Sequence, residues 1–579
     1  MSRVSKFCRL VHLSVSAGGV AAALFACDGQ SAGAPPRLAP QDLTDGGAPD
    51  ASSPPASAAP PTDAGAASDG SAQGDAAVVQ PAFTTMTASG SLVGTLEGST
   101  RRFLGIPYAE PPVGPLRFAP PRPVQPWQGA RSAEAFGAAC PQLGETGTIY
   151  GLAPLPQHED CLFLNVYAPA DTTLRDLPVM VWIHGGSGLS GTGADYDGRF
   201  LSEAGKVVVV TLNYRLGALS SLALPALDAV VGVPSGNLAI RDEQLALRWV
   251  QENIAAFQGD PKNVTLFGES NGAISTCVHI FATGGEELAS RYIMQSGGCL
   301  GSAVNPATRA QAVATSEDVV RALCPNATDV VQCLRALPAD TLVQYKNTRA
   351  NVIEQVGGLH VDGKLLPAHP AKLVAEGRFS QKPILLGTNR HETRFLAAPA
   401  YGEKWPLVTS SIEYSIGVTA MYPDAFVGIL GHYGLPSDAA ANETLTGLMD
   451  DAWFRCAARA LARGVSAAGM DAYLYSFELA PAVHTQEIDY VFGFPDARMS
   501  KMFDGAPVPP DATLTSVMQS YWLNFARTGN PNAAGMPSWP KYEASRDEHL
   551  MLGNTLSVGS NLATNNCDFW DSVLVTPNK

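Results

Sequence analysis

The sequence contains few charged residues, and the acidic ones outnumber the basic ones. Only 16% of its 579 residues are charged, and 38 Lys and Arg stand against 53 Asp and Glu, for a formal net charge of −15. A protein that binds nucleic acid needs a basic surface for the phosphates. The composition therefore argues against nucleic acid as a partner, while 46% hydrophobic residues suffice to bury a large core.

Zinc-binding spacings are also missing. The chain has ten cysteines, but it has no C-x-x-C pair and no Cys/His cluster spaced like a zinc site, so we expect no metal. Apart from Cys8 and Cys27 near the N-terminus, an even number remains, which in an exported chain suggests disulfides, although eight cysteines allow 105 pairings. These eight are Cys140, Cys161, Cys277, Cys299, Cys324, Cys333, Cys456 and Cys567.

No apolar run long enough to span a membrane follows the N-terminal segment. Residues 1–27 have a basic start and an apolar run over 13–26, which predicts an export signal. The run ends in LFAC, which resembles a lipoprotein cleavage box in which Cys27 receives lipid, although Phe25 is unusual there. The alternative is ordinary signal cleavage nearby, without an anchor.

Aromatic residues are absent from residues 28–80, where Ala, Pro, Gly, Ser and Asp dominate. Such a segment buries too little apolar surface to offset its ordering entropy, so we expect a disordered linker. After a lipid-bearing Cys27, this linker would hold a folded domain clear of a membrane.

Residues 81–579 are predicted to form a single α/β domain. Apolar runs at 178–183, 207–212, 264–267 and 383–387 are typical of strands buried on both faces. Helix-like stretches such as 242–254 separate them. This alternation predicts a central, mostly parallel sheet covered by helices on both faces.

Residues 268–272 read GESNG and match the G-x-S-x-G pattern of a nucleophile elbow. The motif follows a predicted strand and precedes a helix-like run at 273–281, which is the context that it requires. Gly268 and Gly272 leave room for a strained turn that would expose the Ser270 hydroxyl at a helix N-terminus. The alternative is a glycine-rich turn with an incidental serine.

Residues 184–188 read HGGSG and directly follow a predicted strand. A glycine-rich turn there can direct the backbone N–H groups of Gly186 and Ser187 at a carbonyl oxygen that gains charge. The amide of Asn271, the residue after the proposed nucleophile, would add a third donor. The alternative is a flexible loop.

Together with further motifs, these residues resemble the type B carboxylesterase/lipase family, which includes the cholinesterases. The resemblance covers residues 103–570, and its motifs are FLGIPYA at 103–109, PLRF at 115–118, EDCLFLNVY at 159–167, NYRLG at 213–217 and GNL at 236–238. It implies the α/β-hydrolase fold and a serine hydrolase that cleaves carboxylic esters without a cofactor.

The resemblance also implies the other two members of a catalytic triad. The family's acid corresponds to Glu392 in GTNRHE at 387–392, and its histidine corresponds to His484 in HTQEIDYVFG at 484–493. The order Ser, acid, His is that of α/β-hydrolases, and only His432, His484 and His549 follow Glu392.

Several supporting features are implied in the same way. Glu269 and Ser296 match positions that support the triad, and Arg117 with Glu159 matches a structural salt bridge. The implied disulfides are Cys140–Cys161, Cys324–Cys333 and Cys456–Cys567. Cys277 and Cys299 have no counterpart, so a fourth disulfide and two buried thiols both stay open.

Two positions depart from the family pattern. Ser187 replaces the third glycine of the oxyanion loop, where its Cβ would crowd the substrate, and Asn271 replaces an alanine, where its side chain would add polarity beside the acyl group. Residues 141–160 lack the tryptophan with which cholinesterases bind quaternary ammonium, and Tyr150 is their only aromatic residue.

The short loop and the missing tryptophan favour small-molecule substrates, namely short- to medium-chain or aromatic esters, over choline esters and insoluble triglycerides. A true lipase is the alternative within the enzyme class. A non-catalytic, cholinesterase-like binding domain is the alternative outside it, but such relatives typically lack a triad residue, and all three are present here.

Overall fold

The computed structural model describes residues 83–144, 154–300, 306–345, 358–397, 406–496, 498 and 509–574. Within these ranges, 13 strands form one sheet with the order β1-β2-β3-β5-β7-β6-β8-β9-β12-β13-β14-β15, and β4 pairs with β2. The strands are β1 (Phe83–Thr87), β2 (Gly90–Glu97), β3 (Thr100–Pro107), β4 (Ala130–Ser132), β5 (Phe163–Pro169), β6 (Leu177–Ile183), β7 (Val208–Leu212), β8 (Gly259–Glu269), β9 (Arg291–Gln295), β12 (Ile384–Asn389), β13 (Ala472–Phe477), β14 (Glu548–Leu552) and β15 (Ser557–Ser560). A separate pair is formed by β10 (Ala307–Thr308) and β11 (His360–Val361).

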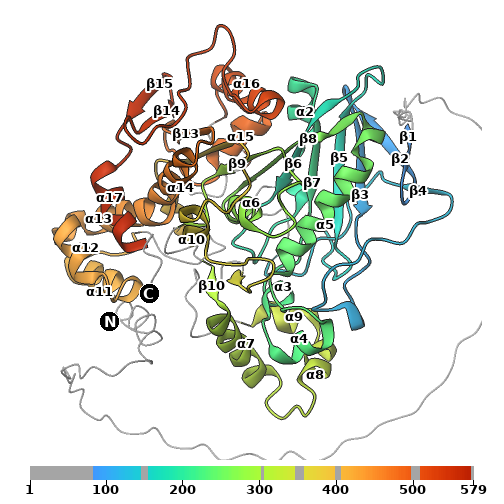
Figure 1. Ribbon diagram of the computed structural model, residues 1–579, viewed down its shortest axis with the longest axis horizontal. Helices are drawn as coiled ribbons and strands as arrows, with labels where there is room; N and C mark the ends of the chain where they lie inside the picture. The colour runs from blue at the N-terminus through green and yellow to red at the C-terminus, as the bar shows by residue number, and fades with distance from the viewer. Residues whose placement is uncertain are drawn as a thin grey trace, which may run out of the picture. The chain divides into compact units, whose positions relative to one another are not determined.

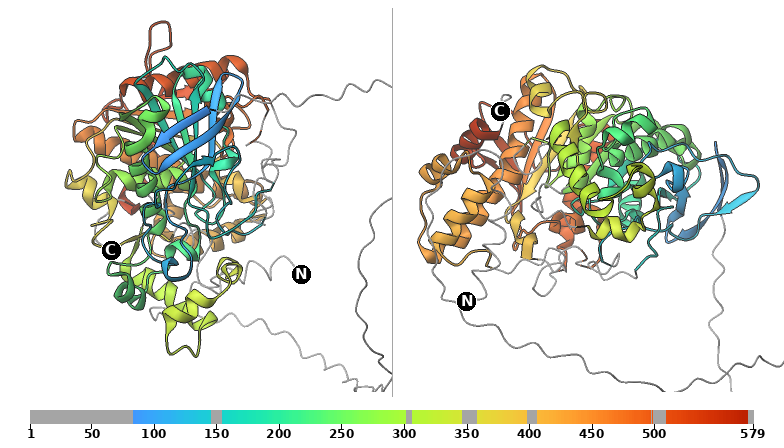
Figure 2. Two further views of the ribbon diagram at one scale, coloured as in Figure 1. Left: turned by 90° about the vertical axis from the view of Figure 1, so that its right-hand side faces the viewer. Right: turned by 90° about the horizontal axis from the view of Figure 1, so that it is seen from below.

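The centre of the large sheet is parallel. From β7 through β6, β8, β9, β12 and β13 to β14, each strand pairs in parallel with the next. Antiparallel pairs occur towards both edges. The N-terminal strands β1 to β3, blue in Figure 2, lie at one edge, and β15 lies at the other (Figure 1). The predicted mostly parallel sheet is therefore confirmed.

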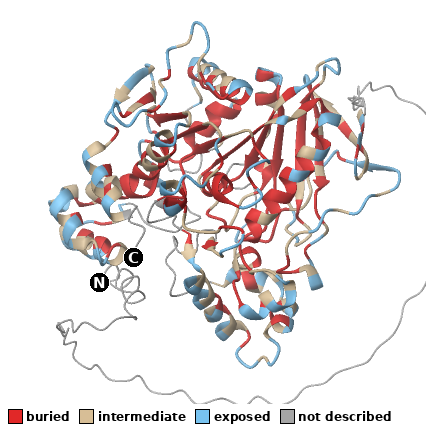
Figure 3. Ribbon diagram, viewed as in Figure 1, coloured by how far each residue is buried: buried red, intermediate tan, exposed pale blue. Residues whose placement is uncertain are grey.

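The central strands are buried on both faces, which explains their unbroken apolar runs (Figure 3). In β6, Val179, Val181 and Ile183 point into one hydrophobic core, while Met180 and Trp182 point into a second core on the opposite face. Successive strand residues point to opposite faces, so one strand contributes to both cores.

Helices cover both faces, as predicted. The first core packs against α5 (Leu238–Asn253), α6 (Asn271–Phe281), α10 (Pro370–Ala375) and α14 (Cys456–Ala467). The second packs against α2 (Arg199–Gly205), α15 (Gln486–Phe492) and α16 (Ala512–Thr528). None of the described helices is long and apolar enough to cross a membrane.

Two further groups of helices have small cores of their own and lie apart from each other, one at the bottom and one at the left of Figure 1. The first comprises α3 (Ala218–Ser221), α4 (Pro225–Val231), α7 (Arg309–Leu323), α8 (Val330–Ala336) and α9 (Ala339–Gln344). The second comprises α11 (Ser411–Met421), α12 (Phe426–Tyr433), α13 (Ala441–Asp450) and α17 (Thr564–Leu574).

Four disulfides cross-link the described residues. They include the three pairs that the family resemblance implies, Cys140–Cys161, Cys324–Cys333 and Cys456–Cys567. The fourth pair, Cys277–Cys299, resolves the alternative that the sequence left open. Arg117 Nε also donates to Glu159 Oε2 at 2.6 Å, as the resemblance implies.

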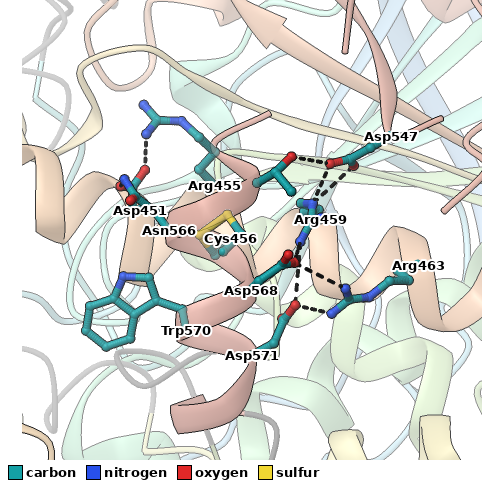
Figure 4. The surroundings of a disulfide bond; sticks show 12 residues. Asp451, Arg455, Cys456, Arg459, Arg463, Asp547, Asn566, Asp568, Trp570 and Asp571 are labelled. Atoms are coloured by element: carbon teal, nitrogen blue, oxygen red, sulfur yellow. Dashed lines mark hydrogen bonds and ion pairs between the residues drawn. A yellow bond between two sulfur atoms is a disulfide. The ribbon is translucent and has the colours of Figure 1, made fainter. Parts of the chain in front are cut away.

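The Cys456–Cys567 disulfide joins α14 to the C-terminal helix α17 and is flanked by ion pairs (Figure 4). Arg459 Nη1 lies 3.0 Å from Asp568 Oδ1 on α17, and its Nε lies 2.8 Å from Asp547 Oδ2. Covalent and ionic contacts together therefore fix the C-terminal helix to α14.

Candidate active site

Ser270 occupies the turn between β8 and α6, in a backbone conformation that side chains rarely adopt. Its φ is 55° and its ψ is −123°, and it occupies the N-cap position of α6 without a capping hydrogen bond from its side chain. A Cβ on Gly272 would collide with the carbonyl oxygens of Ile183 and His184, so only glycine fits there. Strained residues of this kind cost roughly 1–3 kcal/mol and persist where the surrounding structure fixes them.

Glu392 lies just beyond the end of β12, at the start of a 3-10 helix (Glu392–Ala397), and is completely buried. Its Oε1 accepts a hydrogen bond from the backbone N–H of Asn389 at 2.6 Å. Its Oε2 accepts one from Nδ1 of His484, also at 2.6 Å. The carboxylate is thus fixed on one side and holds the imidazole on the other.

His484 lies in the turn that precedes α15 and is 4% exposed. With Nδ1 held by Glu392, its Nε2 lies 3.1 Å from Oε1 of Glu269. Nε2 therefore faces Glu269, the residue that directly precedes Ser270 in the chain. The Phe454 ring lies 5.3 Å from the imidazole, centroid to centroid, and comes from a π-helix, Asp451–Arg455.

The structure therefore brings Glu269, Glu392 and His484 together beside Ser270. They come from the ends of β8 and β12 and from the segment after β13, the edge at which α/β sheets place their active sites. The other two histidines after Glu392 lie elsewhere, since His432 contacts Asn566 and His549 belongs to β14.

Two carboxylates contact the His484 ring and control its protonation. Burial alone would lower the pKa of His484, but the charges of Glu269 and Glu392 outweigh this effect and raise it to about 9. Burial raises the pKa of Glu269 well above its ordinary value; His484 opposes this shift, and Glu487 and Glu392 reinforce it. The two groups therefore titrate as a coupled pair.

Glu487 is a member of this cluster that the sequence reasoning did not single out. Its Oε1 accepts a hydrogen bond from Gln295 at 3.2 Å, and its Oε2 accepts one from the side chain of Asn389. Burial raises the pKa of Glu487 to about 7, and Glu392 adds to the shift. The sequence feature that could have identified Glu487 is its place in the motif at 484–493, three residues after His484.

Ser296 lies at the end of β9, between the strands that lead to the nucleophile and to the acid. Its backbone N–H donates to Gly387 O on β12 at 2.8 Å, and its φ of 51° is again in the left-handed region. Its neighbour Gln295 accepts from the backbone N–H of Ser270 at 2.9 Å. Ser296 therefore joins the end of β9 to β12 through its backbone, and its predicted role in supporting the triad stays a prediction.

The loop after β6 contains Gly186 and Ser187 with φ values of 104° and 57°. Ser187 therefore adopts a glycine-like conformation despite its Cβ, and it is 8% exposed. Further along the loop, the backbone N–H of Gly191 donates to Gln142 Oε1 at 2.8 Å, which fixes the turn. The loop therefore has left-handed backbone at both Gly186 and Ser187.

The Asn271 side chain is buried, with 4% exposure, and connects the nucleophile turn to this loop. Its Nδ2 donates to the hydroxyl of Tyr214 at 3.2 Å, and that hydroxyl donates to His184 O at 2.8 Å. Burial raises the pKa of Tyr214, so the hydroxyl keeps its proton. The polar group expected beside the acyl group is therefore engaged in an internal bridge, which the spacing of 57 residues concealed.

No group of three or more His, Cys, Asp or Glu side chains within the described ranges is arranged to hold a metal ion. The chemistry available at this site is that of a serine, an imidazole and several carboxylates. The fold and this arrangement define an α/β-hydrolase of the serine hydrolase class.

The chain belongs to the carboxylesterase family. The sequence pattern described as "Carboxylesterase family" matches residues 81–570. Carboxylesterase 1C of Mus musculus is 32% identical over 84% of this chain and 92% of its own length. Para-nitrobenzyl esterase of Bacillus subtilis (strain 168) is 34% identical over 82% and 95%, and carboxylesterase 5A of Canis lupus familiaris is 34% identical over 83% and 87%. The protein is a carboxylic ester hydrolase of the serine type.

Proposed function

We propose that Ser270, His484 and Glu392 form the catalytic triad of this esterase. The observation that carries the proposal is the 2.6 Å hydrogen bond between His484 Nδ1 and Glu392 Oε2, next to the strained turn of Ser270. Because Nδ1 is engaged by Glu392, proton transfer to and from Ser270 would pass through Nε2, as it does in other triads of serine, histidine and an acid.

The reaction proceeds by acyl transfer through an acyl-enzyme. His484 Nε2 takes the proton of Ser270 Oγ while that oxygen attacks the ester carbonyl carbon. Glu392 keeps the imidazole in the required tautomer and stabilises the imidazolium. The imidazolium then protonates the leaving alcohol, and a water molecule, activated in the same way, hydrolyses the acyl-enzyme.

The backbone amides of Gly186, Ser187 and Asn271 bind the oxyanion that forms at each attack. One such donor is typically worth about 3 kcal/mol in the transition state. The bridge from Asn271 through Tyr214 to His184 supports this role, because it links the two segments that supply the donors.

The preferred substrates are short- to medium-chain or aromatic esters. The relative named para-nitrobenzyl esterase, whose name specifies an aromatic ester, supports this preference. Tyr150, the only aromatic residue of residues 141–160, lies outside the described residues. A panel of esters that varies acyl and alcohol size tests the proposal, and faster turnover of long-chain emulsions than of soluble esters would favour a lipase instead.

Export is supported by the four disulfides, which are typical of proteins from oxidising compartments. We further propose that Cys27 is lipidated and that residues 28–80 form the linker to a catalytic domain at 81–579; residues 1–82 lie outside the described part. A fatty-acid probe should label the exported wild type but not Cys27→Ala. Equal labelling of both would contradict the anchor.

A further inference from the structure

The Cys277–Cys299 disulfide joins two segments that adjoin the nucleophile, and both its cysteines are completely buried. Cys277 is in α6, the helix that begins directly after Ser270, and Cys299 follows Ser296 by three residues. The family resemblance gives the other three disulfides a counterpart but not this one. The family pattern therefore assigns this disulfide no role.

The turn that carries Cys299 packs against the backbone of the nucleophile on both sides. The N–H of Ser270 donates to Gln295 O at 2.9 Å, just before the turn. On the other side, a Cβ on Gly297 would lie 2.5 Å from Ser270 O, so the two backbones are in direct contact. The position of this turn thus sets the position of Ser270.

The same turn also contacts the strand that leads to the acid. Ser296 N–H donates to Gly387 O on β12 at 2.8 Å, and Glu392 follows the end of β12. The turn is therefore the spacer between the nucleophile and the acid that orients His484. A shift of the turn would change the distance between Ser270 and the imidazole.

Only one end of the turn is secured by the sheet. Gln295 belongs to β9, which pairs with both β8 and β12. The other end is secured by the disulfide to α6, and Cys299 N–H donates to Cys277 Sγ at 3.1 Å. Because Ser270 and Ser296 both hold positive φ values, the surrounding structure must fix them in place.

We propose that the Cys277–Cys299 disulfide is a positioning element of the nucleophile elbow. It holds residues 296–299 against Ser270 so that the serine hydroxyl stays aligned with His484. The inference rests on the proposed role of Ser270 as the nucleophile. It predicts that the cross-link affects the chemical step more than substrate binding.

The test replaces this cross-link and, as a matched control, one remote from the site. Cys277→Ala/Cys299→Ala is compared with Cys324→Ala/Cys333→Ala, whose disulfide joins the end of α7 to α8. Both variants are assayed well below their melting temperatures, and active sites are counted by titration with a fluorophosphonate. The kcat per active site, KM and the rate of phosphonylation are measured for each.

We expect the Cys277/Cys299 variant to lose about 10-fold in kcat and in phosphonylation rate with little change in KM, because small displacements of a reacting group are costly. The control variant should lose thermal stability but keep its kcat. If the alanine pair does not fold, Cys277→Val/Cys299→Ala restores the lost volume and is measured in its place.

An unchanged kcat in the Cys277/Cys299 variant would overturn the positioning role, as would an equal loss of kcat in the control. A wild-type enzyme that the fluorophosphonate does not label at Ser270 would instead overturn the proposed triad. The two failures are therefore distinguishable.

Discussion

Replacement of Glu269 by glutamine should shift the pH dependence of the reaction in a defined direction. In the proposed mechanism, Nε2 of His484 must be free of its proton before it accepts the one from Ser270. Glu269 Oε1 lies 3.1 Å from this nitrogen, and both groups are buried. The negative charge of Glu269 stabilises the imidazolium. The acid limb of the wild-type pH profile of kcat/KM should therefore lie at a pH above the ordinary histidine pKa.

The size of the shift follows from this distance. Two unit charges 3.1 Å apart in an effective dielectric of ~20 attract each other by ~5 kcal/mol. Burial of both groups opposes the attraction, and the two groups titrate as a coupled pair. Because Glu392 remains to stabilise the imidazolium, we expect Glu269→Gln to move the acid limb to lower pH by about 1–2 pH units. This lies within the usual range of pKa shifts that an opposite charge in contact causes.

The assay measures kcat/KM for a soluble nitrophenyl ester from about pH 5 to about pH 10, and the acid limb reports the free enzyme. Glu413→Gln on α11, a carboxylate that hydrogen-bonds to Thr409, is the matched control and should leave the profile unchanged. An acid limb that stays in place in Glu269→Gln, or moves to higher pH, would refute the reasoning.

Three further predictions test other parts of the structure. Burial raises the pKa of Asp450 from 3.8 to about 7, so the folded state holds this proton more tightly than the unfolded state does. Stability therefore falls as the pH rises between these two pKa values. Asp450→Asn should raise the Tm measured by calorimetry more at about pH 8 than at about pH 4, and the opposite order would contradict this. Tyr214→Phe removes the hydrogen bond to His184 O and should lower kcat about 10-fold with KM unchanged, whereas a rise in KM alone would point to substrate binding. Removal of the Cys456–Cys567 disulfide opens a ring with a sequence separation of 111 and should cost ~4–5 kcal/mol in denaturant unfolding, and a loss below ~1 kcal/mol would contradict this.

The sequence predicted those features that depend on local pattern. Strands buried on both faces produce unbroken apolar runs, which located the centre of the sheet. The elbow at Ser270 needs glycines at fixed offsets, so five residues sufficed to find it. Glu392 and His484 lie far apart in the chain, and only the family resemblance pointed to them.

Contacts between distant side chains could not be predicted in this way. The contact of Glu269 with His484 and the bridge from Asn271 to Tyr214 each join residues more than 50 positions apart. No local pattern specifies such pairs, because they depend on how strands are ordered in the sheet. The Cys277–Cys299 pairing was open for the same reason, since cysteine counts do not fix connectivity.

The most direct test of the central claim is covalent labelling of the purified protein with a fluorophosphonate, followed by mass spectrometry of its peptides. An activated serine should bind one phosphonyl group per chain, on the peptide that contains Ser270, and Ser270→Ala should bind none while remaining folded. Absence of labelling in the folded wild type, or labelling of a different residue, would contradict the account.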